Sequence, residues 1–296
     1  MRDALLRDLA LLPYKIYTTV DARLVPPVQV HSLIVVNEGD DVWQIWGQAI
    51  QAADAVWLIA PETDGFLKKL TELAVKLDKP LFGCGLHSVE IASSKVTTYH
   101  VLQQAGIATI PTFSTQNWPE NDGIWLTKPD DGAGCDETFV FENQEELVEW
   151  LATGNKALTH IVQPFQAGLA ASISCVMYHG KAHVLSCNAQ QITVDNKQLK
   201  FNGCIVNGMS EHWEAFEVIA SRIAQALPDL AGYVGVDVIV DGERVIVVEI
   251  NPRLTTSYSV LAEATGVNPA ALIINLLIQG SFSWPKLKQK VIEVHV

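Results

Sequence analysis

The stretch GVDVIVDGERVIVVEINPR, residues 235–253, contains two apolar strand-like segments joined by an Asp-Gly pair, which is typical of a β-hairpin turn. The second segment ends in polar residues, because Glu249, Asn251 and Arg253 follow one another at every second position. Side chains alternate between the two faces of a strand, so these three groups project from the same face. The pattern fits either a solvated strand end or a site that gathers a carboxylate, an amide and a guanidinium.

The loop of this hairpin decides which residue of the first strand lies opposite Glu249. We expect a three-residue loop that places Asp241 opposite Val245, so that Asp237 lies opposite Glu249 on the same face. A change of one residue in the loop would put the two carboxylates on opposite faces. Adjacent carboxylates repel each other unless a cation lies between them, and Mg²⁺ prefers such oxygen ligands together with a phosphate. With Asn251 as a further oxygen donor, the hairpin is a candidate Mg²⁺ site.

Length, composition and charge indicate a globular protein and limit its partners. The 296 residues correspond to about two domains at ~150 residues per domain, and 49% of them are apolar while 18% are charged. The formal net charge of −13 argues against a nucleic-acid partner, since such binding normally requires a basic surface. A single nucleotide needs only a few local positive charges and is not excluded.

Cysteine usage and hydropathy favour a cytoplasmic protein without a membrane partner. The five cysteines form no C-x-x-C pair and no metal-ligand spacing, so we interpret them as reduced thiols. Residues 1–13 are too acidic and too interrupted for a signal peptide. The longest apolar run, residues 269–278, is far shorter than the ~18–20 residues that cross a membrane.

The order of the expected elements divides the chain into two parts. Over residues 1–92, helical patterns alternate with strand-like runs, which predicts a parallel α/β lobe. This lobe opens on a helix where such units usually open on a strand, so either a first strand is missing or the true start lies upstream of Met1. Residues 93–296 show hairpins and longer helices, which predicts an α+β domain with a small inserted subdomain at about 112–163.

Candidate anion-binding residues lie in the second part of the chain. The patterns G-x-x-x-x-G-K-[ST] and G-x-G-x-x-G do not occur, so the ordinary phosphate loops are absent. Lys128 closes a predicted strand and precedes PDDGAGCDET, whose Gly132 and Gly134 can bring backbone N–H groups close to phosphates. Lys95 follows a predicted helix cap. Each feature alone is also typical of an ordinary turn or a solvated lysine.

Taken in chain order, these features resemble the ATP-grasp superfamily. Lys95, Lys128 with its glycine turn, VQPF, Asp237 and the E-x-N-x-R strand end carry the resemblance, which covers residues 93–296. The 1–92 lobe is similar to the α/β domain that precedes the ATP-grasp domain. Within the superfamily, IAPETDG, SSKVTTYHVLQQAGIATIPTF and VVEINPRLTTSYSVL resemble the ATP-dependent carboligase group, which includes the tyramine–glutamate ligase of methanofuran biosynthesis.

The resemblance implies a role for each matching residue. The implied nucleotide contacts are Lys95, Lys128, Gly132, Gly134, Gln163 and Phe165. The lysines and the 130–136 turn would contact the ATP phosphates, and the last two residues would offer backbone groups to adenine. Asp237, Glu249 and Asn251 would hold Mg²⁺, with Mn²⁺ as an alternative, and Arg253 would be the catalytic residue that steadies the transferring phosphoryl or acyl-phosphate oxygens.

The activity implied is that of an ADP-forming carboxylate–amine ligase, which activates a carboxylate as an acyl phosphate before an amine attacks it. The resemblance implies glutamate as one carboxylate substrate, in the biosynthesis of a methanofuran-type coenzyme, and leaves a homodimer open. Two alternatives are a carboxylase-like enzyme that activates bicarbonate and a nucleotide-binding module without catalysis. The complete set of metal-ligand candidates together with Arg253 favours catalysis.

Five residues near these motifs are interpreted without a strong ligand role. Asp130 and Asp131 make the glycine turn acidic, which is unfavourable beside a triphosphate. Gln163 stands where many relatives carry an acid, which weakens the expected contact with ribose. Glu62 follows the strand-like run AVWLIA, which is a usual place for ligand contacts, although Pro-Glu there can simply start a helix. Gln190 follows a predicted strand and either faces the substrate or, as the favoured interpretation, is an exposed hairpin residue.

Overall fold

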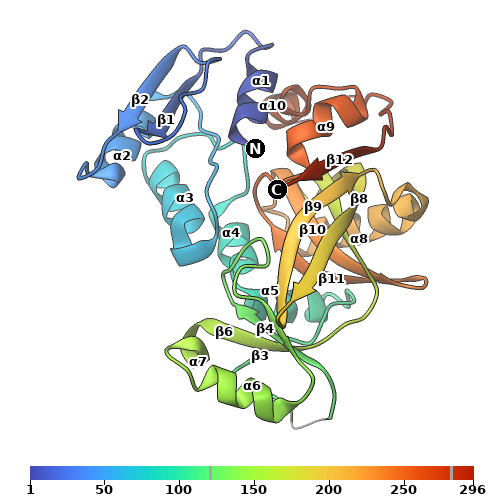
Figure 1. Cartoon of the computed structure of the whole chain (residues 1–296). Helices are drawn as coiled ribbons and strands as arrows, with labels where there is room; N and C mark the ends of the chain where they lie inside the picture. Colours follow the sequence, from blue (N-terminus) through green and yellow to red (C-terminus); the bar gives the residue numbers. More distant parts are fainter. Residues whose placement is uncertain (120–121, 281–282) are drawn as a thin grey trace.

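The computed structural model describes residues 1–119, 122–280 and 283–296 of the chain. Figure 1 shows an N-terminal lobe on one side of the molecule, a large sheet with helices in the C-terminal part, and a small subdomain that extends away from both. The predicted architecture, a parallel α/β lobe followed by an α+β domain with an inserted subdomain, is confirmed.

The N-terminal lobe contains a small parallel sheet, although less of it than the sequence predicts. Strands β1 (Tyr17–Asp21) and β2 (Ser32–Val36) pair in parallel. The predicted strands AVWLIA and PLFGC are reduced to one parallel bridge between Val56 and Leu81. Pro80 has no N–H with which to extend that ladder. The helical elements of the lobe are α2 (Val42–Ala52), the 3-10 turn η1 (Thr63–Gly65), α3 (Phe66–Lys76) and α4 (Leu86–Ala92).

The opening helix α1 (Arg2–Leu9) packs against the C-terminal part of the chain rather than within the lobe. Its Ala4 and Leu5 join a buried cluster with Tyr258 and Leu261 of α9 (Tyr258–Thr265). The lobe itself therefore begins with a strand, β1, and the helix that precedes this strand belongs by its contacts to another layer.

A ten-stranded sheet runs through the rest of the molecule in the order β11-β10-β7-β8-β9-β5-β4-β6-β3, with β12 paired to β9, and all of its ladders are antiparallel. Its strands are β3 (Phe113–Ser114), β4 (Trp125–Pro129), β5 (Phe139–Phe141), β6 (His160–Pro164), β7 (Leu169–Tyr178), β8 (Lys181–Asp195), β9 (Gln198–Val206), β10 (Gly232–Asp241), β11 (Arg244–Asn251) and β12 (Ile292–His295). The accompanying helices are α5 (Lys95–Gln104), α6 (Gln144–Leu151), α7 (Lys156–Thr159), η2 (Ser210–His212), α8 (Trp213–Ala226), α9 and α10 (Pro269–Gln279).

Both faces of the central strands are covered by helices. Alternate residues of β7 and β10 point to opposite faces, so Cys175 and Val234 pack towards α8, whereas Val176 and Tyr233 pack towards α9 and α10. Among the described residues, no single helix is long and apolar enough to cross a membrane. The apolar pair α9 and α10, which is bent by 91°, packs largely within the core.

The inserted subdomain has a small core of its own. Helix α6 packs Leu147 and Leu151 against Trp125 of β4, Phe141 of β5 and Val162 of β6. Asn143 caps α6 by accepting a hydrogen bond from the backbone N–H of Glu146. The sequence predicts this strand–turn–strand–helix–strand unit. Its strands stand at the opposite end of the strand order from β10 and β11, and Figure 1 shows the unit at the bottom of the molecule.

The hairpin of β10 and β11 pairs Asp237 with Glu249 as predicted, but through a shorter loop and a β-bulge. The predicted three-residue loop is wrong, because Asp241 pairs with Arg244 rather than with Val245. Continued regularly, that shorter loop would place Asp237 opposite Val248. A β-bulge shifts the register between Val238 and Asp237, leaves Val248 unpaired, and brings Asp237 opposite Glu249. The bulge therefore brings Asp237 back to the same face of the hairpin as Glu249, which the shorter loop alone would not do.

Gly235 should be intolerant of any side chain, because it lies where the turn after β11 crosses β10. A Cβ atom there would lie 2.4 Å from Cγ2 of Thr255. The hydroxyl of Thr255 is also 2.7 Å from that of buried Tyr233. We expect Gly235→Ala to lower the free energy of unfolding by about 1–3 kcal/mol, as measured by urea denaturation.

A matched control is Gly83→Ala, because a Cβ atom at Gly83 meets nothing within 4 Å. Equal stability of the two variants would contradict the close packing of the 251–257 turn on β10.

Candidate active site

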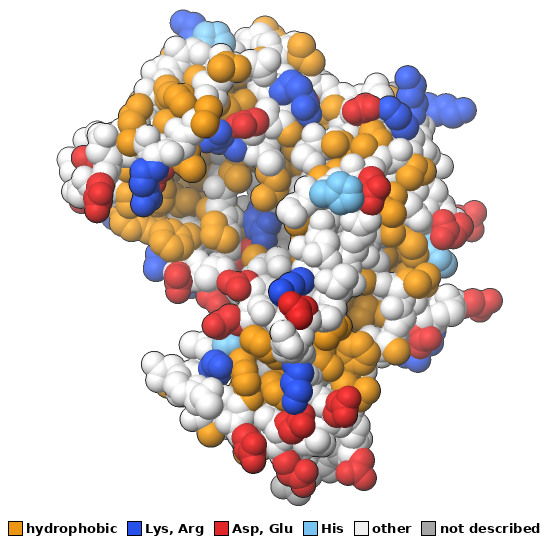
Figure 2. Space-filling model, viewed as in Figure 1, with side chains coloured by type: hydrophobic (Ala, Val, Ile, Leu, Met, Phe, Trp, Pro, Cys, Tyr) orange, Lys and Arg blue, Asp and Glu red, His pale blue; other side chains and the backbone are white. Residues whose placement is uncertain are grey.

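One cavity of about 460 Å³ gathers every residue that the sequence predicts for nucleotide, metal or catalysis. Its lining includes Lys95, Lys128, Gly132, Gly134, Gln163, Phe165, Asp237, Glu249, Asn251 and Arg253. The cavity lies where the start of α5, the subdomain strands β4 and β6, and the β10–β11 hairpin meet. Figure 2 shows the surface hollowed between the N-terminal lobe and the subdomain.

The carboxylates of Asp237 and Glu249 form the centre of this site. They face each other across β10 and β11. Both oxygens of Asp237 accept hydrogen bonds from amides, Oδ1 from Nε2 of Gln190 at 2.8 Å and Oδ2 from Nδ2 of Asn251 at 3.2 Å. Gln190 is half-buried in the cavity, so its interpretation as an exposed hairpin residue is wrong.

The charges around the pair make Glu249 the more acidic of the two carboxyl groups. Loss of solvation and the neighbouring Glu249 raise the pKa of Asp237 to about 7. Loss of solvation also opposes the ionisation of Glu249, but the ammonium groups of Lys128 and Lys95 prevail and lower the pKa of Glu249 to about 2. A divalent cation at this point would remove the reason for Asp237 to hold a proton.

The donor set fits Mg²⁺ when a phosphate completes it. Asp237, Glu249 and the amide oxygen of Asn251 provide hard oxygen donors on one face of the hairpin. Among the residues that the structure describes, no group of three or more His, Cys, Asp or Glu side chains could hold a metal ion. Mg²⁺ is typically bound through one or two carboxylates plus substrate phosphates, so this sparse set suits a metal that arrives with a nucleotide.

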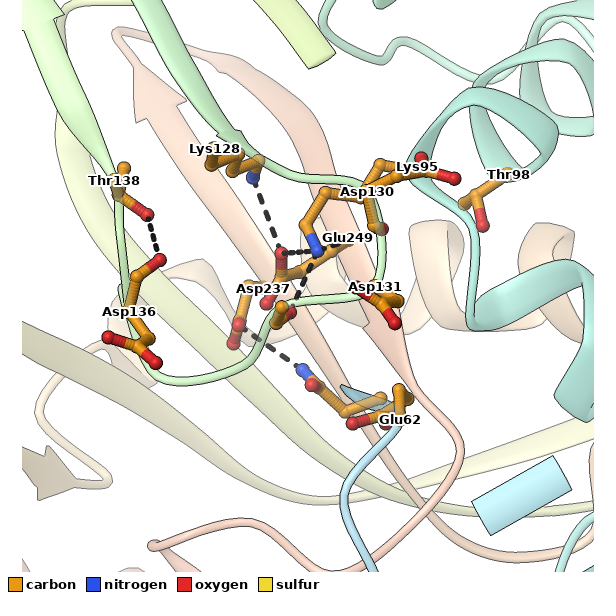
Figure 3. A network of polar contacts seen from close by, with 12 residues as sticks. Glu62, Lys95, Thr98, Lys128, Asp130, Asp131, Asp136, Thr138, Asp237 and Glu249 are labelled. Carbon is orange, nitrogen blue, oxygen red and sulfur yellow. Dashed lines mark hydrogen bonds and ion pairs between the residues drawn. The ribbon is translucent and has the colours of Figure 1, made fainter. Parts of the chain in front are cut away.

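Two buried lysines lie beside the carboxylate pair, as Figure 3 shows. Nζ of Lys128 donates to Oε2 of Glu249 at 3.3 Å, and Nζ of Lys95 lies 3.7 Å from the same oxygen. Lys95 also donates to the carbonyl oxygens of Asp130 and Gly132. Burial lowers the pKa of Lys95, while Glu249 opposes that change. Both ammonium groups thus lie where a triphosphate could replace these contacts.

The acidic residues of the glycine turn have structural partners. Oδ1 of Asp130 accepts the backbone N–H of Val96 in the first turn of α5, at 3.0 Å. Oδ2 of Asp131 accepts the backbone N–H of Asp64, in the N-terminal lobe, at 2.9 Å. Both carboxylates therefore dock the turn onto its neighbours, which explains why an acidic sequence is present in this turn.

The two residues of the predicted adenine site lie at the end of β6. The side chain of Gln163 donates to the hydroxyl of Thr112 at 2.8 Å. The backbone N–H of Phe165 donates to the carbonyl of Ile124 at 2.9 Å, so an adenine contact by Phe165 would use its carbonyl oxygen. The structure places both residues at the cavity wall, and their contact with adenine stays a prediction.

Arg253 lies at the edge of the cavity and forms an ion pair that the sequence does not reveal. Its Nε donates to Oε2 of Glu62 at 2.7 Å. Burial raises the pKa of Glu62, although the guanidinium of Arg253 opposes that change. Glu62 does precede η1, as expected of a helix start, but it also reaches the site. Its position after an apolar strand-like run was the only sequence signal for this second role.

Comparison with known proteins identifies the class to which this fold and site belong. A family model of the ATP-grasp domain matches residues 92–257, and a model of the pre ATP-grasp 3 domain matches residues 14–89. The chain belongs to the ATP-grasp family, as the sequence motifs predict.

One curated relative of this chain is a ligase. The tyramine–L-glutamate ligase of Methanocaldococcus jannaschii is 28% identical over 204 residues, which are 69% of this chain and 57% of that enzyme. The chain therefore spans less than two thirds of the length of that relative.

Two solved structures share the fold. The L-amino acid ligase of Bacillus licheniformis has a TM-score of 0.75 and 18% identity, over 92% of this chain and 70% of that chain. The biotin carboxylase domain of the Hydrogenobacter thermophilus 2-oxoglutarate carboxylase, solved with MgADP and bicarbonate, has a TM-score of 0.74 and 14% identity, over 96% of this chain and 68% of that chain. At these identities the likeness establishes the fold alone.

The docking of the glycine turn onto α5 can be tested through Asp130. Removal of a side chain that accepts a first-turn N–H of a helix typically costs about 1 kcal/mol. We expect Asp130→Ala to lower the free energy of unfolding by about that amount. Asp130→Asn should remain close to the parent protein, because its amide oxygen can still accept from Val96. Urea denaturation of both variants measures the difference. An equal loss of unfolding free energy in Asp130→Asn and Asp130→Ala would argue against a stabilising hydrogen bond from Val96 to Asp130.

Proposed function

We propose that this protein is an ATP- and Mg²⁺-dependent carboxylate–amine ligase with glutamate as its carboxylate substrate. The observation that carries the proposal is the meeting of a carboxylate pair, two buried lysines and an arginine in one cavity of an ATP-grasp fold. The ligase relative described above supports glutamate as the substrate, and tyramine is the first amine to test.

Each group has a task that follows from its charge. Lys95 and Lys128 bind the phosphates of ATP and exchange their contacts with Glu249 for contacts with phosphate oxygens. Asp237, Glu249 and Asn251 would hold Mg²⁺, which would supply positive charge beside the transferring phosphoryl group. The turn at 130–136 covers the phosphates and limits the access of water.

The reaction proceeds in two balanced steps. A carboxylate oxygen of the substrate attacks the γ-phosphorus of ATP and releases ADP, which gives an acyl phosphate. The neutral amine then attacks the acyl carbon, an amide bond forms, and inorganic phosphate leaves while the amine loses a proton. Arg253 steadies the oxygens of the transferring group in both steps, because its planar fork can bind two oxygens at once.

Binding of ATP with Mg²⁺ should stabilise the protein measurably. A ligand present at a hundredfold excess over its Kd adds about 2.7 kcal/mol to the free energy of unfolding. We therefore expect a clear rise in Tm with millimolar ATP and Mg²⁺ in a thermal melt, and a smaller rise with ATP and EDTA. An unchanged Tm at millimolar nucleotide would contradict the proposal at its first step.

A coupled assay of ADP release over a panel of carboxylates and amines tests the activity. A ligase predicts release that requires both partners, with glutamate and tyramine as the first pair. Release that requires bicarbonate and no amine would instead indicate carboxylase-like chemistry. Nucleotide binding without ADP release from any pair would indicate a nucleotide-binding module without catalysis.

The role of Glu249 can be separated from its role in folding. Glu249→Gln keeps the size and the hydrogen-bonding capacity of the side chain but removes the charge that Mg²⁺ requires. We expect turnover to fall by about 10²–10³-fold while Tm changes little. Glu145→Gln is the control, because Glu145 is an exposed residue of α6. Near-normal turnover of Glu249→Gln at saturating Mg²⁺ would overturn the metal assignment.

A further inference from the structure

Glu62 and Arg253 join the two parts of the chain through an ion pair with little exposure to solvent. The residues are 191 positions apart, and Nε of Arg253 lies 2.7 Å from Oε2 of Glu62. The side chains are 6% and 12% exposed, respectively, for Glu62 and Arg253. Such a pair loses the hydration of both charges, so stability alone is a weak explanation for it.

The contact with Glu62 fixes the guanidinium of Arg253 at its Nε atom. Besides Nε, Nη1 of Arg253 donates to the carbonyl of Leu254 at 3.1 Å, and Nη2 donates to Oδ1 of Asn251 at 3.5 Å. A guanidinium has five N–H donors in one plane, so these three contacts set the plane and leave one N–H group each on Nη1 and Nη2. Those two groups are the ones that could bind a pair of substrate oxygens.

The residues that follow Glu62 hold the glycine turn. The backbone N–H of Asp64 donates to Oδ2 of Asp131 at 2.9 Å, and the hydroxyl of Thr63 donates to the carbonyl of Asp131 at 3.5 Å. Asp64 adopts a left-handed conformation with φ of 56°, which Asp tolerates better than most residues. Figure 3 shows Glu62 and Asp131 beside the carboxylate pair. Within three consecutive residues, Glu62 therefore contacts Arg253, and Thr63 and Asp64 contact the glycine turn.

We propose that Glu62 is a positioning residue for Arg253, and that the segment Glu62–Asp64 links this arginine to the nucleotide-binding turn. The contact of Asp131 with Asp64 is already formed, so a nucleotide that stabilises the turn also stabilises Asp64, and the same short segment holds Glu62 against the guanidinium. The N-terminal lobe would in this way contribute to the reaction without touching the nucleotide. The inference rests on the proposed function, because it requires Arg253 to act on the transferring group.

Steady-state kinetics test the positioning role. Glu62→Gln keeps an acceptor for Nε but removes the charge, and Glu62→Ala removes both. Loss of a group that orients a functional residue typically lowers activity on the order of 10–100-fold. We expect kcat to fall in the order parent, Gln, Ala, while KM for ATP stays close to the parent value. Tm should stay close to the parent value in Glu62→Gln and fall in Glu62→Ala, which leaves the guanidinium of Arg253 without a partner at Nε. The control is Glu72→Ala on α3, an exposed acidic residue of the same lobe.

Two outcomes would overturn this role. Unchanged kcat in Glu62→Ala would show that Arg253 needs no partner. A parallel rise in KM for ATP, or a fall in Tm that accounts for the lost activity in both variants, would make Glu62 a structural residue only.

Hydrogen exchange tests the link without turnover. A non-hydrolysable ATP analogue with Mg²⁺ should slow exchange at residues 130–136 and also at 61–66 in the parent protein. Asp131→Ala should abolish the second effect and keep the first, whereas Asp131→Asn should keep both, since its amide oxygen can still accept from Asp64. Protection at 130–136 with none at 61–66, or full protection of both segments in Asp131→Ala, would overturn the link and leave the proposed function intact. No protection and no rise in Tm would overturn both.

Discussion

Asp237 and Glu249 face each other across two neighbouring strands in a cavity with limited solvent, and their mutual repulsion has to be offset by the groups around them. Two amides bind the oxygens of Asp237, and two ammonium groups lie within 4 Å of Glu249, at 3.3 and 3.7 Å. These four groups come from β8, the end of β11, β4 and the start of α5. Four different elements of the second part of the chain thus each contribute a charge or a dipole to this one pair.

The need to offset this repulsion explains why the subdomain and the N-terminal lobe both reach the cavity. The subdomain provides Lys128 from its strand β4 and covers the site with the glycine turn, while its own aromatic core keeps the strand in place. The N-terminal lobe reaches the site through Glu62 and through its contact with Asp131. Lys128 donates to Glu249, and Lys95 donates to the turn carbonyls of Asp130 and Gly132, so the two ammonium groups hold the carboxylate pair and the glycine turn together.

The sequence predicts the parts of the site that depend on local pattern. Alternation along β11 places Glu249, Asn251 and Arg253 on one face. A helix cap at Ser93 or Ser94 is predicted just before Lys95, and Ser94 is the cap, since its hydroxyl oxygen accepts from the backbone N–H of Thr97. The β-bulge at Val248 could not be predicted, because an unpaired valine among valines leaves no local signal. The contact of Glu62 with Arg253 and that of Gln190 with Asp237 depend on tertiary structure, which no spacing in the chain reveals. Asp130 and Asp131 looked unfavourable only because their backbone partners lie on other elements.

The most direct test of the central claim is to locate the metal. Crystals grown with Mn²⁺ and a non-hydrolysable ATP analogue allow the metal to be identified by its anomalous scattering. The account predicts a Mn²⁺ peak between the carboxylates of Asp237 and Glu249, at ~2.0–2.3 Å from their oxygens and bridged to the phosphates of the analogue, with Lys128 moved from Glu249 to a phosphate oxygen. A bound analogue whose metal lies away from this pair, or a pair that keeps its contacts with Lys128 and Gln190 while the nucleotide binds elsewhere, would contradict it.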